Sequence, residues 1–247
     1  MKLQVNSTEK TFYNIIEKIK KKDRCIYSRF GDGDIYAMMG KSSSNMRHSK
    51  ELEYEMQEAF SIKHTDYLKG IAVDYKREPG MYDGVFAPHQ TNHLMSDWLN
   101  QHFKEHLNDL YESAVTYHYF SIFRQQEMLL FLDNYIRSKK VMFVGSIPKK
   151  SIERLLGNIE FYIEVPPKNA YYNIKEWYPK LEKNINKTEI CIPAAGLATR
   201  IVNKNLWKSD VEVVSLDLGS IVDAVDNRNT RTWIRKEGNE ISNLLIK

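Results

Sequence analysis

Two aspartates separated by one glycine are the residues of this chain whose spacing most directly suggests chemistry. Asp32 and Asp34 lie in the segment Ser28–Asp34 (SRFGDGD), directly after the apolar run 24–27, which is typical of a buried strand. Two carboxylates this close repel each other unless a positive charge lies between them. A hard divalent cation such as Mg²⁺ or Mn²⁺ commonly supplies that charge, often shared with substrate phosphates. The motif therefore predicts a divalent metal site with Asp32 and Asp34 as ligands.

Three residues beside these aspartates are suited to an anionic substrate. Arg29 could contact a phosphate or hold the carboxylates, and Gly31 and Gly33 let the backbone turn sharply after the strand. A metal held here would neutralise a diphosphate and stabilise it as a leaving group. The alternative is an ordinary turn in which aspartate hydrogen-bonds the backbone, because the Asp-x-Asp spacing also arises by chance.

The composition is that of an ordinary globular protein. Of 247 residues, 42% are hydrophobic and 28% are charged, which is enough for a substantial core. No break in composition divides the chain, so we expect a single domain over residues 1–247. The formal charge of +4 favours anionic ligands only weakly and does not indicate nucleic acid as a partner.

Two features indicate where the protein works. Cys25 and Cys191 both lie in apolar strand-like runs, which favours buried thiols in a reducing compartment over a disulfide. The first residues, 1–7, lack the apolar segment of a signal peptide, and no apolar stretch approaches the thickness of a bilayer. We therefore expect a cytoplasmic protein without an integral membrane segment.

Apolar strand-like runs alternate with segments of helical period along the chain. Strands are expected at residues 24–27, 67–74, 114–119, 140–145, 161–165, 189–193 and 211–216. Helices are expected at residues 8–22, 34–40, 50–61, 91–103, 120–138, 169–183 and 197–208, with a further start at Pro148 and a loop at 75–88. This alternation predicts an α/β fold, a Rossmann-like, mostly parallel sheet with helices on both faces. The carboxyl ends of its strands would meet at one edge, where a ligand crevice is expected.

Four segments together resemble the GT-D-type bacterial glycosyltransferases, a Rossmann-like family that transfers a sugar from a nucleotide sugar. The segment Arg29–Asp34 resembles the family's Arg-x-Gly-Asp-Gly-Glu signature, and Val165–Tyr171 resembles its Pro-x-Lys-Asn-Ala segment. Ala195–Thr199 and Ser215–Ser220 resemble its glycine-rich turn and its Asp-x-Gly segment near the C-terminus. The segments keep the family's order and span most of the chain. At the metal motif this chain has Asp34 where the family has glutamate, which leaves the reach of the shorter side chain open.

The resemblance implies a metal-dependent glycosyltransferase that uses a nucleoside-diphosphate sugar, foremost a UDP-sugar. The acceptor would be a glycan, a glycoprotein or a glycolipid. The family's metal-binding positions correspond here to Asp32 and Asp34, which would hold Mn²⁺ or Mg²⁺.

The other segments carry the expected substrate contacts. Lys168 and Asn169 would lie at the start of a helix, where backbone N–H groups and a cation attract a phosphate; the alternative is an Asn169 cap beside a solvated lysine. Two glycine turns, each with a hydroxyl residue, would bring backbone close to the nucleotide, or they are ordinary strand-to-helix turns. These turn residues are Gly145, Ser146, Gly196 and Thr199.

Transfer to a hydroxyl also needs a group that accepts the proton. Asp217 and Asp223 are the candidates, because they lie in and just beyond the Asp-x-Gly segment after an expected strand. Alternatively, Asp217 caps the last helix. Two other functions stay open on the sequence, a Mg²⁺-dependent phosphoryl hydrolase that uses the same acids and a non-catalytic nucleotide-binding module.

Overall fold

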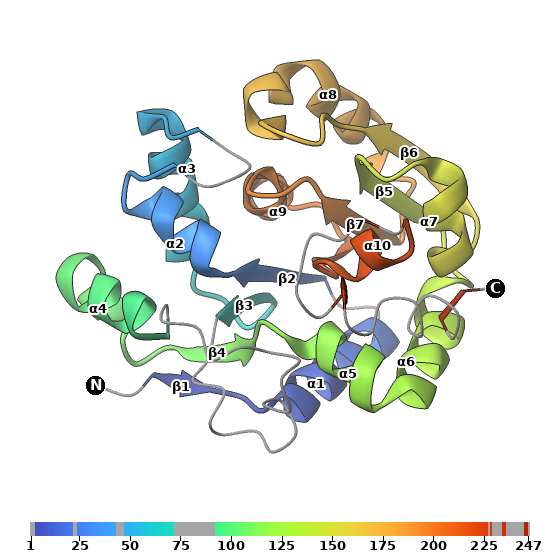
Figure 1. Ribbon diagram of the computed structural model, residues 1–247, viewed down its shortest axis with the longest axis horizontal. Coiled ribbons are helices and arrows are strands. Elements are labelled where there is room, and N and C mark those ends of the chain that lie inside the picture. The colour runs from blue at the N-terminus through green and yellow to red at the C-terminus, as the bar shows by residue number, and fades with distance from the viewer. Residues whose placement is uncertain are drawn as a thin grey trace.

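The part of the chain that the structure describes forms one parallel sheet of eight strands covered by helices (Figure 1). The computed structural model describes residues 3–21, 24–42, 47–71, 92–226, 228, 234–235 and 245–246. The strands are β1 (Gln4–Val5), β2 (Cys25–Phe30), β3 (Tyr67–Ile71), β4 (Leu110–Ser113), β5 (Val141–Gly145), β6 (Ile159–Glu164), β7 (Ile190–Ala194) and β8 (Val214–Leu216). Their order across the sheet is β1-β4-β3-β2-β8-β7-β5-β6, and every pair is parallel.

Helices connect the strands on both faces of the sheet. The α-helices are α1 (Thr8–Lys21), α2 (Asp32–Met38), α3 (Lys50–Ser61), α4 (Asn92–His102), α5 (Thr116–Phe123), α6 (Gln125–Phe131), α7 (Lys149–Leu156), α8 (Ile174–Ile185), α9 (Ala198–Lys208) and α10 (Ile221–Ala224). Short 3₁₀ helices are η2 (Lys104–His106) and η4 (Ala170–Asn173), and η3 (Leu132–Ile136) is a π-helical turn.

The core lies in layers on either face of the sheet. On one face, Phe12 of α1 stacks on Phe120 of α5 at 3.8 Å between ring centroids, and both pack in one cluster with Tyr27. The preceding residue of β2, Ile26, faces the opposite layer, where it packs in one cluster with Trp177 of α8. This alternation along buried strands is what a parallel sheet covered on both faces requires.

The predicted fold class is confirmed, and most predicted elements lie where the sequence indicated. The strand expected at 114–119 is wrong, because the fourth strand is Leu110–Ser113 and residues 116–123 form α5. The segment Thr116–Phe123 is rich in aromatic residues, which favour strands locally, but it is helical where it packs against α1. The helix expected at 120–138 is interrupted at Arg124. Asp74 and the loop at 75–88 lie outside the described residues.

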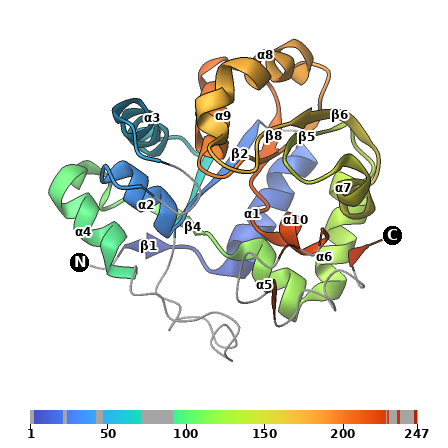
Figure 2. The same cartoon turned by 45° about the horizontal axis from the view of Figure 1, so that its top comes forward.

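The connections after β2 and β8 create the sheet's switch point. The two strands are neighbours, and α2 follows β2 onto the face of Phe30 while α10 follows β8 onto the face of Tyr27 (Figures 1 and 2). Where adjacent strands send their connections to opposite faces, the loops diverge, and ligands commonly bind at that point of the carboxyl edge. The first candidate motif, which begins α2, therefore lies beside the segment that follows β8.

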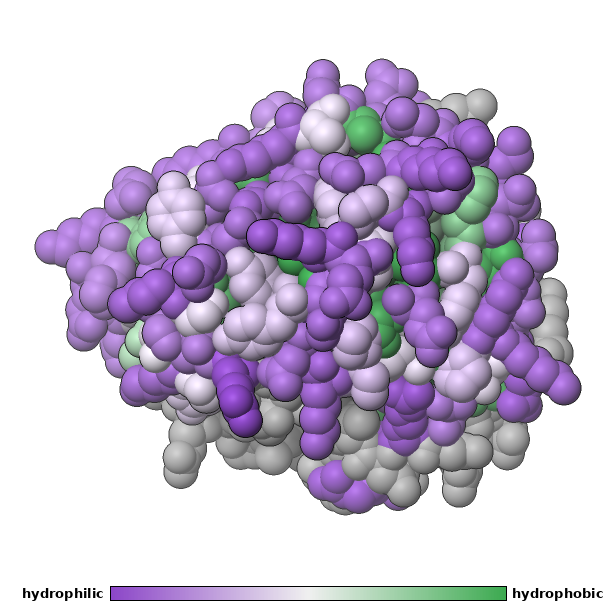
Figure 3. Space-filling model, turned by 90° about the horizontal axis from the view of Figure 1, so that it is seen from above, coloured by the Kyte–Doolittle hydropathy of each residue, from purple (hydrophilic) through white to green (hydrophobic). Residues whose placement is uncertain are grey.

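The outer surface shows the polar side of this arrangement. The face that carries α3 and α8, seen from above in Figure 3, is largely hydrophilic, and hydrophobic residues show there only as small separate areas. Among the described residues, no helix is long and apolar enough to cross a membrane.

Candidate functional site

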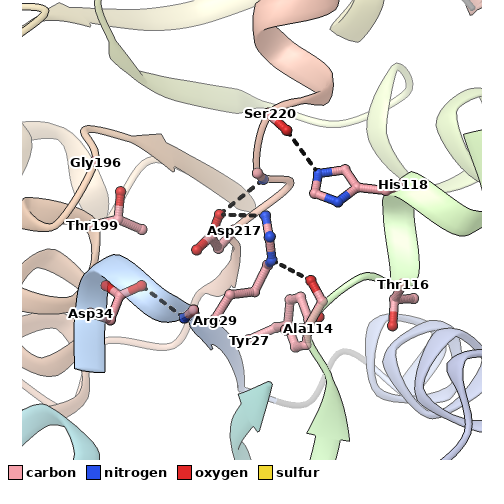
Figure 4. Close-up of polar contacts among 12 residues, drawn as sticks. Tyr27, Arg29, Asp34, Ala114, Thr116, His118, Gly196, Thr199, Asp217 and Ser220 are labelled. Atoms are coloured by element: carbon pink, nitrogen blue, oxygen red, sulfur yellow. Dashed lines mark hydrogen bonds and ion pairs between the residues drawn. The ribbon is translucent and has the colours of Figure 1, made fainter. Parts of the chain in front are cut away.

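Arg29 lies at the carboxyl edge of β2 and reaches toward β8. Its Nε donates a hydrogen bond to the carbonyl of Ala114 at 2.5 Å, and its Nη1 lies 3.7 Å from Oδ1 of Asp217 (Figure 4). The side chain is 17% exposed, so Arg29 is partly accessible to solvent at this edge of the sheet. The fixed Nε contact orients this cation across the gap between the two strands.

Asp217 follows β8 directly and closes the turn that leads to α10. Its backbone N–H donates to the carbonyl of Tyr27, and its Oδ1 accepts a hydrogen bond from the N–H of Gly219 at 2.9 Å. Gly219 has φ +66°, and a Cβ there would lie 1.4 Å from Nη1 of Arg29. Glycine is required at this position, both for its backbone angle and for the passage of Arg29.

Asp34 is the third residue of α2, and its carboxylate points back to the helix start. Its Oδ2 accepts a hydrogen bond from the N–H of Gly31 at 2.9 Å (Figure 4). The side chain is 6% exposed. Burial raises the pKa of Asp34 to about 6, although the positive charge of Arg200 acts in the opposite direction.

Arg200, on the first turn of α9, joins these parts. Its Nη2 donates to Oδ2 of Asp34 at 2.9 Å, and its Nε lies 2.8 Å from Oδ1 of the same carboxylate as an ion pair. Its Nη1 donates to the carbonyl of Gly196 and lies 3.1 Å from Oδ2 of Asp217. Burial acts to lower the pKa of Arg200, but the charges of Asp34 and Asp217 outweigh it. The pKa of Arg200 is therefore raised, and the guanidinium is charged. One buried cation thus bridges α2, the turn before α9 and the end of β8.

These contacts test whether the predicted aspartates fit a divalent metal. Oδ1 of Asp34 and Oδ2 of Asp217 are buried without a hydrogen bond, which is what a metal ligand would show. However, Arg200 fills the space between them at ion-pair distance, whereas Mg²⁺ would need oxygens at about 2.1 Å. Asp32 binds the N–H of Gly33, and residues two apart on a helix do not face each other. No group of three or more His, Cys, Asp or Glu side chains suited to a metal occurs among the described residues. The arrangement does not fit a metal held by Asp32 and Asp34.

The predicted residues around β7 and β5 lie at the same edge but act locally. Oγ1 of Thr199 accepts a hydrogen bond from the N–H of Ala195, and Gly196 has φ +61° with open space where a Cβ would lie. A Cβ at Gly145 would collide with the Phe143 ring at 2.5 Å, so packing requires this glycine. Ser146 accepts hydrogen bonds from Arg228 through both its Oγ and its carbonyl.

Lys168 and Asn169 lie further along the edge, after β6. Asn169 adopts the left-handed conformation with φ 55°, and its Oδ1 accepts a hydrogen bond from the N–H of Arg47. Tyr172 donates to the carbonyl of Arg47, so this segment anchors the connection between α2 and α3. Asn169 is therefore a link between two segments and does not cap η4 through its side chain. Lys168 is exposed and makes no ion pair with the residues that the structure describes.

Sequence reasoning missed two groups at the crevice. Arg200 stands one residue beyond the glycine-rich segment, and the only signal was a charged residue on an otherwise buried helical turn. His118 of α5 lies 3.2 Å from Oγ of Ser220 through its Nε2, beside the Asp217 turn (Figure 4). His118 is 6% exposed, and the aromatic run around it gave no sign that it would lie beside the segment after β8. Asp223 lies on α10 and is half-buried.

Comparisons with known proteins agree with this fold. A solved structure described as a new glycosyltransferase (DUF1792) from Streptococcus sanguinis is similar with a TM-score of 0.65 and 14% identity, over 92% of this chain and 83% of that one. A structure of the highly conserved domain of unknown function 1792, described as having a distinct glycosyltransferase fold, has a TM-score of 0.65 and 17% identity, over 100% of this chain and 85% of that one. No curated protein matches the chain. The family model of the glycosyltransferase GT-D fold matches residues 27–232, from β2 through the crevice to the segment beyond α10, and the chain therefore belongs to the GT-D-fold glycosyltransferase family.

Proposed function

We propose that this protein transfers a sugar from a nucleoside-diphosphate sugar, foremost a UDP-sugar, to the hydroxyl of a glycan, glycoprotein or glycolipid. The observation that carries the proposal is the set of charged side chains at the switch point between β2 and β8. Arg29, Asp34, Arg200 and Asp217 lie there in a chain of the GT-D-fold family. Nucleotides commonly bind at such a switch point.

The proposed reaction needs a leaving diphosphate to be stabilised. The acceptor oxygen forms a bond to the anomeric carbon while the bond from that carbon to the diphosphate oxygen breaks. Arg29 supports this step, because its guanidinium is held by the carbonyl of Ala114 and its side chain is partly exposed at the carboxyl edge. Lys168 is a second cation at the edge and would contact the outer phosphate or the nucleotide. We leave a divalent ion out of this scheme, because the carboxylate oxygens that would bind it contact Arg200.

The proton of the acceptor hydroxyl must pass to a base as the new bond forms. We propose Asp217 first, because it directly follows β8 at the carboxyl edge, lies beside Arg29 and Arg200, and is oriented by its contact with the N–H of Gly219. Asp223 is the second candidate on the adjoining helix. We also propose a cytoplasmic location, which the buried free thiols of Cys25 and Cys191 support.

The test is a donor panel. Release of nucleoside diphosphate and formation of glycoside would be measured with several nucleotide sugars and simple glycoside acceptors. We expect turnover with one nucleotide-sugar class, and a loss of about a hundredfold or more in kcat for Asp217→Asn. Asp109→Asn is the matched control, because Asp109 is also an ion-paired aspartate but lies at the opposite edge of the sheet. It should leave turnover unchanged.

Three results would count against the proposal. Hydrolysis of a simple phosphate ester without any sugar nucleotide would indicate the phosphoryl hydrolase instead. Tight nucleotide binding by calorimetry without turnover on any donor would indicate a binding module. Equal loss of activity in Asp217→Asn and Asp109→Asn would remove Asp217 from the reaction, since a general loss of folding would explain both.

A further inference from the structure

We infer that Arg200 takes the place of a divalent cation at the acidic motif of this chain, so that its reaction proceeds without a metal ion. The claim that Arg200 replaces a metal ion rests on the geometry alone. The claim that the reaction needs no metal also rests on the proposed function. A DxD-type motif would ordinarily be assigned a metal by its sequence. The contacts of Asp34 argue for a protein cation in that position.

Both carboxylate oxygens of Asp34 already lie against a protein cation. Both oxygens face Arg200, at 2.8 Å from Nε and 2.9 Å from Nη2, and Oδ2 also accepts the Gly31 N–H. The contact from Nη2 is a hydrogen bond and the contact from Nε is an ion pair, so two nitrogens of one planar guanidinium lie against the carboxylate, which a single point charge could not provide. A metal ligated by Asp34 would have to break the contact with Arg200 inside a site that is 6% exposed.

Asp217 is held by the same cation. Its Oδ2 lies 3.1 Å from Nη1 of Arg200, while Oδ1 accepts the Gly219 N–H. The third nitrogen of the guanidinium therefore contacts the second carboxylate, and the carbonyl of Gly196 accepts a hydrogen bond from it as well. Arg200 thus makes to both carboxylates the contacts that a bridging metal would make.

The charges of this cluster balance. Asp34 and Asp217 contribute two negative charges, and Arg200 and Arg29 contribute two positive ones. A divalent cation is drawn to a site with excess negative charge, because its ligands must repay the loss of its hydration. Adding two positive charges to a buried cluster that is already neutral would be unfavourable while both arginines remain.

The relation of Asp32 to Asp34 supports the same conclusion. The two carboxylates start from the first and third residues of α2, so they point in different directions around the helix axis. Oδ1 of Asp32 accepts the N–H of Gly33, and Asp34 turns toward Gly31 and Arg200. The two aspartates that the sequence suggests as joint metal ligands therefore make separate contacts. Asp32 binds the backbone at the start of α2, and Asp34 forms a buried ion pair with Arg200.

The experiment measures Mn²⁺ binding, which needs no substrate. Chelator-treated protein would be titrated with Mn²⁺ by calorimetry and by electron paramagnetic resonance, alone and with UDP. We expect no stoichiometric binding by the wild type up to millimolar Mn²⁺. Arg200→Gln should gain one Mn²⁺ site, because it leaves Asp34 and Asp217 without their cation, and the double variant Arg200→Gln/Asp34→Asn should lose that site again.

Arg137→Gln is the matched control for the loss of a buried arginine. The Arg137 side chain is 8% exposed and pairs with Asp133, but it lies between η3 and α7, away from the crevice. It should gain no Mn²⁺ site. If Arg200→Gln does not fold, the wild-type titration still decides, and the double variant, which removes both charges of the pair, provides a second folded comparison.

The claim that the reaction needs no metal is tested by chelation. With any donor that turns over, excess EDTA should leave the initial rate within about twofold, whereas loss of a catalytic metal would cost far more. Stoichiometric Mn²⁺ binding by the wild type that Asp34→Asn or Asp32→Asn abolishes would overturn the inference, with or without UDP. So would a rate lost in EDTA and restored by Mn²⁺. Absence of turnover with every donor would count against the proposed function alone, since the Mn²⁺ titrations stand without it.

Discussion

Two aspartates at opposite edges of the sheet show how differently one residue type is used in this protein. Asp34 lies at the carboxyl edge, and Asp109 lies at the amino edge, directly before β4. Each is ion-paired with a buried cation, Arg200 or Lys69. Burial acts to raise the pKa of both. It raises that of Asp34 to about 6, but at Asp109 the hydrogen bonds from His106 and Lys69 outweigh burial and lower the pKa.

The difference follows from how each carboxylate is solvated. Asp109 is 17% exposed and gathers three nitrogen partners, His106 Nδ1 at 2.7 Å, Lys69 Nζ at 3.0 Å and Lys63 Nζ at 3.2 Å. Asp34 is more deeply buried and shares its ion-pair partner Arg200 with Asp217. Burial therefore disfavours the charged form of Asp34, as is common at functional sites. The hydrogen bonds around Asp109 favour its charged form, so that charge stabilises the fold.

Removing the shared cation should have the largest effect on stability. Arg200→Met leaves Asp34 and Asp217 buried without their main partner, which should lower the free energy of unfolding by about 3–5 kcal/mol. Urea unfolding followed by circular dichroism measures the loss. A loss below about 1 kcal/mol would mean that water reaches these carboxylates and that the bridge is not a tight one.

The pH dependence of stability should separate the two aspartates by sign. Because the pKa of Asp34 in the folded state is raised from 3.8 to about 6, the unfolded chain releases this proton first, and the contribution of Asp34 to stability falls as pH rises from about 4 to about 6. Relative to wild type, Asp34→Asn should therefore gain up to about 3 kcal/mol in unfolding free energy across that window.

Asp109 should show the opposite trend. Its folded-state pKa is lowered, so its contribution is present above the unfolded value of 3.8 and is lost as pH falls below it. Asp109→Asn should flatten the acid limb of the stability curve and leave the range from pH 4 to 6 unchanged. Urea unfolding at several pH values compares the three proteins, and parallel curves for both variants would remove the distinction between the edges.

Removing the amino-edge cation should have a smaller effect than removing Arg200. Lys69→Met leaves Asp109 with His106 and Lys63, and it removes the ammonium group that donates to the carbonyl of Phe60 and lies over the Phe60 ring. We expect a loss of about 1–3 kcal/mol in the free energy of unfolding by the same urea assay. If Lys69→Met lost as much unfolding free energy as Arg200→Met, the larger number of partners around Asp109 would not explain why Asp109 and Asp34 differ.

The exposed cation of the carboxyl edge should affect binding and not folding. Lys168→Ala removes an exposed side chain, so the unfolding free energy should stay within about 0.5 kcal/mol of wild type. The KM for the nucleotide sugar should rise about tenfold if the ammonium group contacts a phosphate. Steady-state kinetics measure this, and an unchanged KM would remove Lys168 from the donor site.

The sequence predicted the sheet because buried parallel strands are continuous apolar runs, as in Val141–Gly145, and these need no long-range information. It failed at Thr116–Phe123, where packing against α1 overrides a local preference for strand. The blocks at Arg29–Asp34 and Asp217 were placed at one edge correctly, since the connection rule fixes that edge. The bridge between them was not predictable, because Arg200 and Asp34 are 166 positions apart and only the folded chain brings them together.

The position of a bound nucleotide would show most directly which edge of the sheet carries the functional site. A groove of about 590 Å³ beside α1, lined by Lys10, Lys18, Lys63 and Lys69 among others, offers positive charge at the amino edge. A crystal structure with bound UDP would decide between that groove and the crevice. We predict the diphosphate at the carboxyl ends of β2 and β8, within hydrogen-bond distance of Arg29, with Arg200 still between Asp34 and Asp217. UDP in the groove beside α1, or a metal ion in the place of Arg200, would contradict it.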